Sequence, residues 1–174
     1  MSDIQKVQRA KKGNNKAFQE LMEKEKVKLY KIAYVHMKNE EDALEVFQET
    51  VYKAFISIKN LKDERHFSTW LTRILINTAF DLLKRKKRII PMEREILESK
   101  IKPTRSSETD VDLLQAVMDL DEKYKTVIIL RFYKDYSVKQ IAGIWDCPEG
   151  AVKTNIHRGV NLLREKLEVD CVNE

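Results

Sequence analysis

The chain has 174 residues and a net charge of +5, and 43% of its residues are hydrophobic while 35% are charged. Four Gly and three Pro are little material for the turns of a β-rich fold, and no apolar run approaches the length of a membrane span. The first residues do not form the pattern of a secretory signal. These features predict an all-α, cytoplasmic protein with one domain or two small ones.

The residue types of catalytic and metal sites are scattered along the chain. Cys147 and Cys171 have no partners at metal-ligand spacing, and the three histidines stand apart. The sequence contains no Gly-rich phosphate loop, no paired-carboxylate cluster and no Ser–His or Cys–His constellation. It therefore predicts no enzymatic activity, no catalytic residue, no cofactor, no metal and no small-molecule substrate. A nuclease is an alternative that a metal-dependent cleavage assay would test.

The N-terminal part of the chain predicts two helices. Three apolar residues share one side of a short first helix: Ile4, Val7 and Ala10. That helix ends at Gly13, a residue suited to the left-handed C-terminal position. Asn14 or Asn15 caps the second helix. Five apolar side chains of the second helix are predicted to point inward: Phe18, Leu21, Leu29, Ile32 and Ala33.

A third helix begins after Asn39, whose side chain caps it, with acidic residues at its positive end. One face is apolar and carries Leu44, Phe47, Val51, Ala54, Phe55 and Ile58. The opposite face is acidic and amide-bearing and carries Asp42, Glu45, Gln48, Glu49 and Tyr52. A solvated helix face is the simpler interpretation. Because the same domain also has a strongly basic segment, we interpret the acidic face as a separate docking surface.

The segment from Asn60 to His66 is predicted to be a loop, and Ser68 is predicted to cap a fourth helix that ends near Lys87. Most of the circumference of this helix is apolar. Its narrow polar stripe holds Arg73, Asn77 and Lys84, with Asp81 at the margin. The stripe runs into the basic block of residues 84–88. Because Arg and Asn side chains hydrogen-bond to bases and phosphates, the stripe predicts contact with nucleic acid, and a solvated helix end is the alternative.

Pro91 ends the helical pattern, and residues 91–109 are polar, weakly periodic and rich in helix breakers. We therefore predict a domain of residues 1–90, a flexible linker of residues 91–109 and a second domain of residues 110–174. Two helices begin the second domain. Their predicted inward side chains are Leu113, Leu114, Val117 and Met118 in the first and Val127, Ile128, Leu130 and Phe132 in the second.

A helix-turn-helix follows in the second domain. Ser137 and Gln140 form a capping box, Asp146 and Cys147 interrupt the helical pattern, and Pro148 suits the first position of the next helix. The predicted inward positions are Val138, Ile141, Ala142, Trp145, Val152, Ile156, Gly159, Leu163 and Leu167. The outer arc of the second helix carries Lys153, Thr154, His157, Arg158 and Asn161. This arc predicts a DNA-reading helix, and a helical hairpin with a solvated basic face is the alternative.

Three stretches together resemble the sigma-70-type initiation factors of bacterial RNA polymerase, in particular the small extracytoplasmic-function (ECF) group. Residues 41–55 look like the family's polymerase-binding helix, residues 67–81 like its minus-10 helix and residues 120–167 like its minus-35 domain. The resemblance implies two partners, core RNA polymerase and promoter DNA, which is melted at the minus-10 element and duplex at the minus-35 element. It also implies an anti-sigma factor, which in this family is commonly membrane-anchored.

The resemblance also implies roles for particular residues. The third helix would dock on the polymerase clamp through Asp42, Glu45, Gln48 and Glu49. The loop would take one flipped base of the melted minus-10 strand through Lys62, Asp63, Glu64, Arg65 and His66, and Asn77 would help to read the minus-10 element. The polar stripe itself adds Arg73 and Lys84 to the predicted minus-10 surface. The last helix would read the minus-35 element through Lys153, Thr154, His157 and Arg158. Three residues depart from the family pattern: Asp81, where a neutral or basic group is frequent, His157, whose position varies widely and gives no base preference, and Asp146, where Gly is common.

A stand-alone helix-turn-helix activator or repressor is the alternative to a sigma factor. Such a regulator needs a dimerisation surface or a ligand pocket, and it leaves the acidic third helix without a role. Binding of promoter duplex in the absence of polymerase would distinguish it from a sigma factor.

Overall fold

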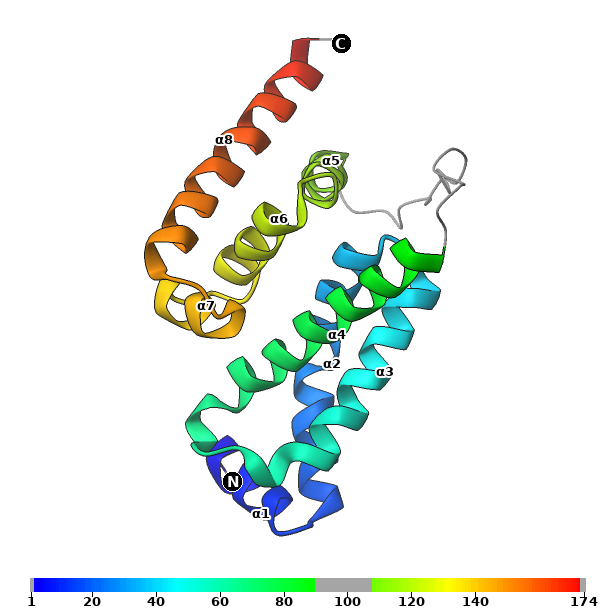
Figure 1. The fold of residues 1–174 in the computed structure, drawn as a ribbon, viewed down its shortest axis with the longest axis vertical. Helices are drawn as coiled ribbons and strands as arrows, with labels where there is room; N and C mark the ends of the chain where they lie inside the picture. The colour runs from blue at the N-terminus through cyan, green and yellow to red at the C-terminus, as the bar shows by residue number, and fades with distance from the viewer. Residues whose placement is uncertain (1, 90–107, 173–174) are drawn as a thin grey trace. The chain divides into compact units, whose positions relative to one another are not determined.

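The computed structural model describes residues 2–89 and 108–172, and every regular element in these ranges is helical (Figure 1). The chain divides into two compact units, residues 1–84 and 85–174. The predicted all-α architecture with two helical units is confirmed. Most of the predicted linker, residues 91–107, lies outside the described residues.

The N-terminal unit consists of four helices, with two short 3₁₀ turns between the third and the fourth. Its elements are α1 (Asp3–Lys11), α2 (Asn15–Met37), α3 (Glu40–Ser57), η1 (Ile58–Asn60), η2 (Glu64–His66) and α4 (Phe67–Ile89). The long helix α2 packs against both α1 and α3, and α1 also contacts η1 and η2. The N-terminal helix therefore lies beside the segment that joins α3 to α4.

Local signals begin and end the first three helices as predicted. Ser2 and Gln5 form a capping box at the start of α1, and Gly13 adopts a left-handed φ of 90° just after it. The side chains of Asn14 and Asn39 cap α2 and α3. In each case a side-chain oxygen accepts a hydrogen bond from an N–H group of the first turn that has no helical partner.

The core of the N-terminal unit combines residues from all four helices. The five side chains of α2 that were predicted to point inward are all buried. From α4 the core receives Leu71, Leu75, Ile76, Ala79 and Leu82. Removing this apolar surface from water is the main favourable contribution to the stability of such a unit.

The prediction of which face of α3 is buried was wrong, because the buried face is rotated about the helix axis from the predicted one. The positions that α3 buries are Asp42, Ala43, Val46, Thr50 and Ala54. Leu44 and Phe55, which we expected inside, are each 47% exposed. Small side chains let α3 lie close to α2, and the buried Thr50 hydroxyl donates to the Val46 carbonyl at 2.7 Å. Close packing with a satisfied hydroxyl therefore prevails over the larger apolar side chains.

The predicted cap of α4 was also wrong. The helix begins at Phe67, directly after η2, so that Ser68 lies inside its first turn. The Ser68 hydroxyl donates instead to Oε1 of Glu25 at 3.3 Å, which joins α4 to α2. The side chain that caps this segment belongs to Asp63, which accepts from the Arg65 N–H at 3.0 Å.

The C-terminal unit is built around one long helix. Its elements are α5 (Glu108–Met118), α6 (Glu122–Ile128), the π-helical turn η3 (Ile129–Tyr133), α7 (Val138–Trp145) and α8 (Glu149–Val172). The helix α8 packs against α5, α6 and α7. Its approach to α6 is close, because a Cβ added at Gly159 would lie 3.0 Å from Cγ1 of Ile128.

Three predicted core residues of the C-terminal unit are exposed. Leu113 and Leu114 are 45% and 46% exposed, because the buried residues of α5 lie in its last turn. Phe132 is 60% exposed. In η3 the Lys134 N–H donates to the Ile129 carbonyl, five residues back, at 3.2 Å. The extra residue of this π turn shifts the helical register, so a simple 3.6-residue period places Phe132 on the wrong side.

The helix-turn-helix forms from the predicted local signals. Ser137 and Gln140 complete a capping box at α7. Asp146 ends α7 in the left-handed region, with φ 52° and ψ 50°. Val152, Gly159 and Leu163 of α8 are buried against the unit. Among the residues that the structure describes, none of the helices combines the length and apolarity needed to cross a bilayer.

Candidate nucleic-acid and partner interfaces

The helix α4 carries a polar stripe on its solvent-exposed side. Its members are all exposed and recur at helical spacing: Arg73, Asn77, Asp81 and Lys84. The flanking residues Leu75 and Ile76 are buried, which confines the polar groups to a narrow strip. The last turn adds Lys86, Lys87 and Arg88, whose cations favour the negative end of the helix dipole. The stripe thus offers amide and guanidinium donors next to positive charge, the chemistry that bases and phosphates require.

Asp63 carries the first of two carboxylates in the loop before α4, and its partners belong to the same loop. The guanidinium of Arg65 donates to both carboxylate oxygens of Asp63, at 3.0 Å and 3.1 Å from Nε and at 2.7 Å from Nη2. His66 Nδ1 lies 3.3 Å from the same carboxylate. These hydrogen bonds from Arg65 hold the pKa of Asp63 far below its usual range. Asp63 therefore orients the side chain of Arg65, which remains largely exposed.

Glu64 carries the second carboxylate of the loop, and its partner belongs to α1, which is distant in the sequence. Lys11 Nζ, in the last turn of α1, donates to Oε1 of Glu64 at 2.7 Å and to the Leu61 carbonyl oxygen at 2.7 Å. The hydrogen bond from Lys11 lowers the pKa of Glu64. Sequence analysis missed Lys11, because its partners are 50 and 53 positions away and no local pattern marks such a contact.

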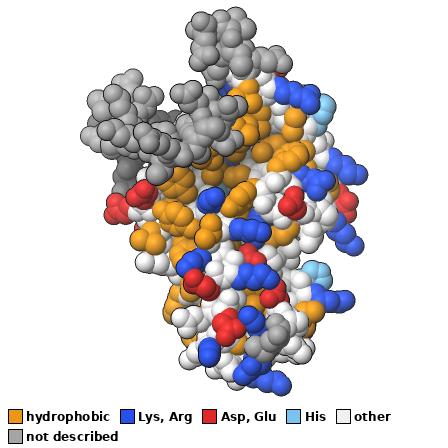
Figure 2. Space-filling model, turned by 180° about the vertical axis from the view of Figure 1, so that it is seen from behind, with side chains coloured by type: hydrophobic (Ala, Val, Ile, Leu, Met, Phe, Trp, Pro, Cys, Tyr) orange, Lys and Arg blue, Asp and Glu red, His pale blue; other side chains and the backbone are white. Residues whose placement is uncertain are grey.

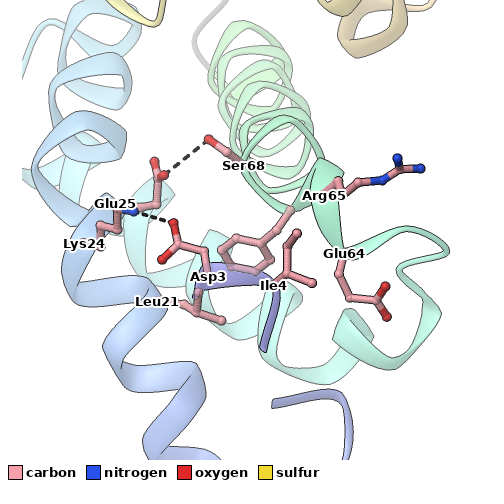
Figure 3. A pocket seen from close by; sticks show the side chains of 9 residues that line it. Asp3, Ile4, Leu21, Lys24, Glu25, Glu64, Arg65 and Ser68 are labelled. Atoms are coloured by element: carbon pink, nitrogen blue, oxygen red, sulfur yellow. Dashed lines mark hydrogen bonds and ion pairs between the residues drawn. The ribbon is translucent and has the colours of Figure 1, made fainter. Parts of the chain in front are cut away.

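A pocket of about 210 Å³ lies beside the loop. It is lined by residues of α1, α2, η2 and α4: Asp3, Ile4, Leu21, Lys24, Glu25, Glu64, Arg65, Phe67 and Ser68 (Figure 3). Lys24 forms an ion pair with Asp3 across it, and the hydrogen bond from Ser68 to Glu25 spans its other side. The loop alone does not form this pocket, because α1 and α2 supply more than half of its lining.

The exposed face of α3 is acidic and apolar at once. Glu45 and Gln48 are exposed, as predicted. Tyr52 is exposed there too, as predicted, and three large apolar side chains that we did not expect on this face accompany it: Leu44, Phe55 and Ile56. On the side of the molecule in Figure 2, hydrophobic side chains likewise lie at the surface among charged ones. A partner that binds this face of α3 needs apolar as well as cationic groups.

Asp42 and Glu49, which were predicted to dock a partner, have contacts within the unit. Asp42 is only 8% exposed, because Nδ2 of Asn39 donates to its carboxylate at 2.6 Å. The expectation that Asp42 lies on an exposed face is therefore wrong. Glu49 forms an ion pair with Lys53 at 2.8 Å, and Lys53 Nζ also lies 3.1 Å from the Thr78 hydroxyl of α4.

The outer arc of α8 lies where the sequence predicted it. All of its predicted reading residues are exposed: Lys153, Thr154, His157 and Arg158. The Thr154 hydroxyl donates to the Gly150 carbonyl at 2.9 Å, and Nδ2 of Asn161 lies 3.3 Å from Nε2 of His157. Both contacts lie within α8, so the side chains of this arc are positioned by their own helix. Each helical unit thus exposes a polar surface made of the residue types that contact nucleic acids.

Comparison with known proteins covers both units. Residues 21–89 match the family Sigma-70 region 2, and residues 110–163 match Sigma-70, region 4. The chain is 36% identical over 138 residues to RNA polymerase sigma factor SigV of Bacillus subtilis, covering 79% of this chain and 83% of that protein. It is 31% identical over 177 residues to ECF RNA polymerase sigma factor SigW of the same organism, covering 93% and 95%.

A solved structure is also similar, the sigma factor RpoE of Bartonella quintana in complex with the anti-sigma factor NepR. The TM-score is 0.79 at 25% identity, and the match covers 89% of this chain and 99% of that one. The chain belongs to the sigma-70 family of RNA polymerase sigma factors, in its ECF group. The expected function in transcription initiation is confirmed, and a stand-alone regulator does not account for a match that spans both units.

Proposed function

We propose that the N-terminal domain, residues 1–90, binds core RNA polymerase and captures the melted minus-10 strand, while residues 110–174 read the minus-35 duplex. The observation that carries this proposal is the separation of two faces within one small unit. The α3 face is acidic and apolar, whereas the α4 stripe is basic and amide-bearing. One surface therefore fits a protein partner, and the other fits nucleic acid.

On α3, Glu45 and Gln48 are the exposed polar members of the docking face, and Leu44 and Tyr52 supply apolar area beside them. We propose that a coiled coil of the polymerase clamp docks there. Asp42 and Glu49 act in this proposal by holding α3 in place, since both are already engaged within the unit. Apolar contacts at the centre and charges at the rim are typical of protein interfaces of this kind.

At the minus-10 element, we propose that the α4 stripe and the loop hold a strand that has left the duplex. Asn77 can donate and accept at one base edge, and Arg73 and Lys84 can neutralise phosphates on either side of it. The pocket beside Glu64 and Arg65 offers room for a base out of the stack. Unpairing costs a few kcal/mol per base, and contacts made only with the melted strand offset that cost.

At the minus-35 element, we propose that Lys153, Thr154, His157 and Arg158 enter the major groove. One helix reads few base pairs and gains much of its affinity from phosphates, so it binds weakly by itself. Joining it to a second reader raises the effective concentration of each at its own element.

We propose that this chain is not an enzyme. It selects the promoter sequence, and the polymerase provides the catalytic site. Its place of action would be the cytoplasm, where the polymerase and the chromosome lie. The similarity to a sigma factor solved with an anti-sigma factor supports a further proposal, that an anti-sigma factor regulates this chain too.

The test is transcription reconstituted with core polymerase, followed by mapping of start sites. Start sites that appear only with the chain present, and that share two conserved elements upstream, would support the proposal. Asn77→Ala should leave core binding and thermal stability intact but slow open-complex formation, and a pre-melted minus-10 bubble should restore activity only partly. Full rescue by the bubble would assign Asn77 to strand separation rather than to strand capture.

A further inference from the structure

The loop between α3 and α4 is fixed at two points by one side chain of α1. Lys11 Nζ contacts the Leu61 carbonyl and the Glu64 carboxylate at 2.7 Å each, and the Lys11 and Glu64 side chains are 22% and 24% exposed. Leu61 is itself buried, and its N–H donates to the Ile58 carbonyl at 3.1 Å. The two contacts of Lys11 therefore bracket Lys62 and Asp63 between an anchored backbone and an anchored carboxylate.

This bracing determines which charges of the loop face solvent. Arg65 already holds Asp63 with three hydrogen bonds, and Lys11 holds Glu64. In the close view of the pocket, the Glu64 and Arg65 side chains point in different directions (Figure 3). Both carboxylates are engaged and only partly exposed, whereas the cations of Lys62 and Arg65 are exposed and lie where an anion can reach them. A carboxylate released beside a phosphate would repel it, and a loop without fixed ends would lose more entropy on binding.

We propose that Lys11 is a positioning residue for capture of the melted promoter strand. Its ammonium group holds the loop from Leu61 to His66 in the shape that receives the strand, and it keeps the Glu64 carboxylate away from the phosphates. This inference rests on the proposed function, because it assumes that the loop contacts melted DNA. It extends the minus-10 surface from the lining that Asp3 and Ile4 of α1 give the pocket to a second part of the same helix, its last turn.

The structure provides a matched control for simple anchoring of α1. Lys6 Nζ forms an ion pair with Glu20 of α2 at 3.0 Å, whereas the partners of Lys11 lie in the loop. Lys6→Met and Lys11→Met remove the same charge from the same helix. If α1 acts only as a structural support, the two substitutions should have similar effects. If Lys11 orders the loop, only Lys11→Met should alter binding of the strand.

The experiment uses holoenzyme formed with the full chain and a fluorescent single-stranded oligonucleotide that carries the non-template minus-10 sequence of a mapped promoter. Lys11→Met should raise the Kd for this strand about tenfold, the scale expected when a charge-assisted contact is lost. Lys6→Met should change it by less than about twofold, as for an exposed ion pair. Lys11→Arg, which can donate to both acceptors, should retain most of the wild-type affinity.

Adding Glu64→Gln to Lys11→Met should recover part of the lost affinity, because the released side chain then carries no charge. Wild-type Kd in Lys11→Met, or an equal loss in Lys6→Met, would overturn the role of Lys11. Failure of the proposed function would look different: the wild-type holoenzyme would not bind the strand, or Arg65→Ala within the loop would have no effect. Melting temperatures of all variants, measured alongside, would show whether a loss of affinity follows a loss of folding.

Discussion

The two units present their proposed DNA surfaces in different ways. In the N-terminal unit the surface is assembled from segments far apart in the sequence, with Lys11 of α1 joined to Glu64 of the loop and Glu25 of α2 joined to Ser68 of α4. In the C-terminal unit the surface lies on α8 alone, where the Thr154 hydroxyl donates to the Gly150 carbonyl of the same helix. The first surface depends on tertiary contacts, and the second depends on the placement of one helix.

This difference determines how each surface should respond to substitution. Distant residues should affect strand capture in the N-terminal unit, because they set the shape of a loop. In the C-terminal unit, only two kinds of change should affect reading: loss of a side chain that contacts DNA, and a change that moves α8 away from α6. Substitutions in each unit test that distinction.

The largest effect is expected at the α3 face. Glu45→Lys combined with Gln48→Lys should weaken binding of core polymerase roughly a hundredfold, because reversed charge at an interface costs several kcal/mol. Both side chains are exposed, and melting temperatures measured alongside would separate a loss of binding from a loss of folding. Affinity would be measured by titration of labelled protein with core polymerase.

Gln19→Lys on α2 is the control, since Gln19 is exposed and lies outside the α3 face. An equal loss in Gln19→Lys would show that net charge, rather than the α3 face, governs binding. We avoid Glu49 in this design because its ion pair with Lys53 would be lost as well, which confuses binding with stability.

The sequence predicted the helices and the exposed arc of the C-terminal helix-turn-helix more fully than the surfaces of the N-terminal unit, and the reason is physical. Capping boxes such as Ser137 with Gln140 act within four residues, so they can be read from the chain directly. The rotation of α3 depends on which side packs closely on α2, and the size of its apolar side chains gave the wrong answer. The contact of Lys11 with Glu64 depends on tertiary folding, and the π turn at Ile129 changes the period itself.

The second prediction concerns the packing of α8 against α6. Gly159→Ala should lower the free energy of unfolding of the C-terminal unit by roughly 2 kcal/mol, because the new methyl group would lie 3.0 Å from Cγ1 of Ile128. A Trp70→Phe background leaves Trp145 as the sole tryptophan, so its fluorescence reports this unit during denaturation. Gly150→Ala, where a Cβ meets no atom within 4 Å, should not destabilise to this extent. Equal losses would refute close packing as the cause.

The third prediction tests direct reading by α8. Arg158→Ala should weaken holoenzyme binding to a promoter with an intact minus-35 element by about 1–2 kcal/mol, the range for one base or phosphate contact. Arg164→Ala, also exposed on α8 but on a different arc, should have little effect. If Arg158 contacts a base, the loss should vanish on a scrambled element. If it contacts only phosphate, the loss should persist and the salt dependence of binding should decrease. No loss on either promoter would show that this arc is merely solvated.

The smallest effect separates folding from reading in the same unit. Gly143 lies in α7, is exposed, and would place an added Cβ within 4 Å of no other atom. Gly143→Ala should therefore raise the free energy of unfolding of the C-terminal unit by about 0.5–1 kcal/mol, because glycine loses more backbone entropy than alanine when a helix forms. The measurement is again Trp145 fluorescence in the Trp70→Phe background. Promoter affinity at a temperature where the wild type is fully folded should not change, since α7 carries none of the proposed reading residues. A variant that is more stable but binds the minus-35 element less tightly would place α7 in the interface, and the DNA surface of this unit would then extend beyond a single helix.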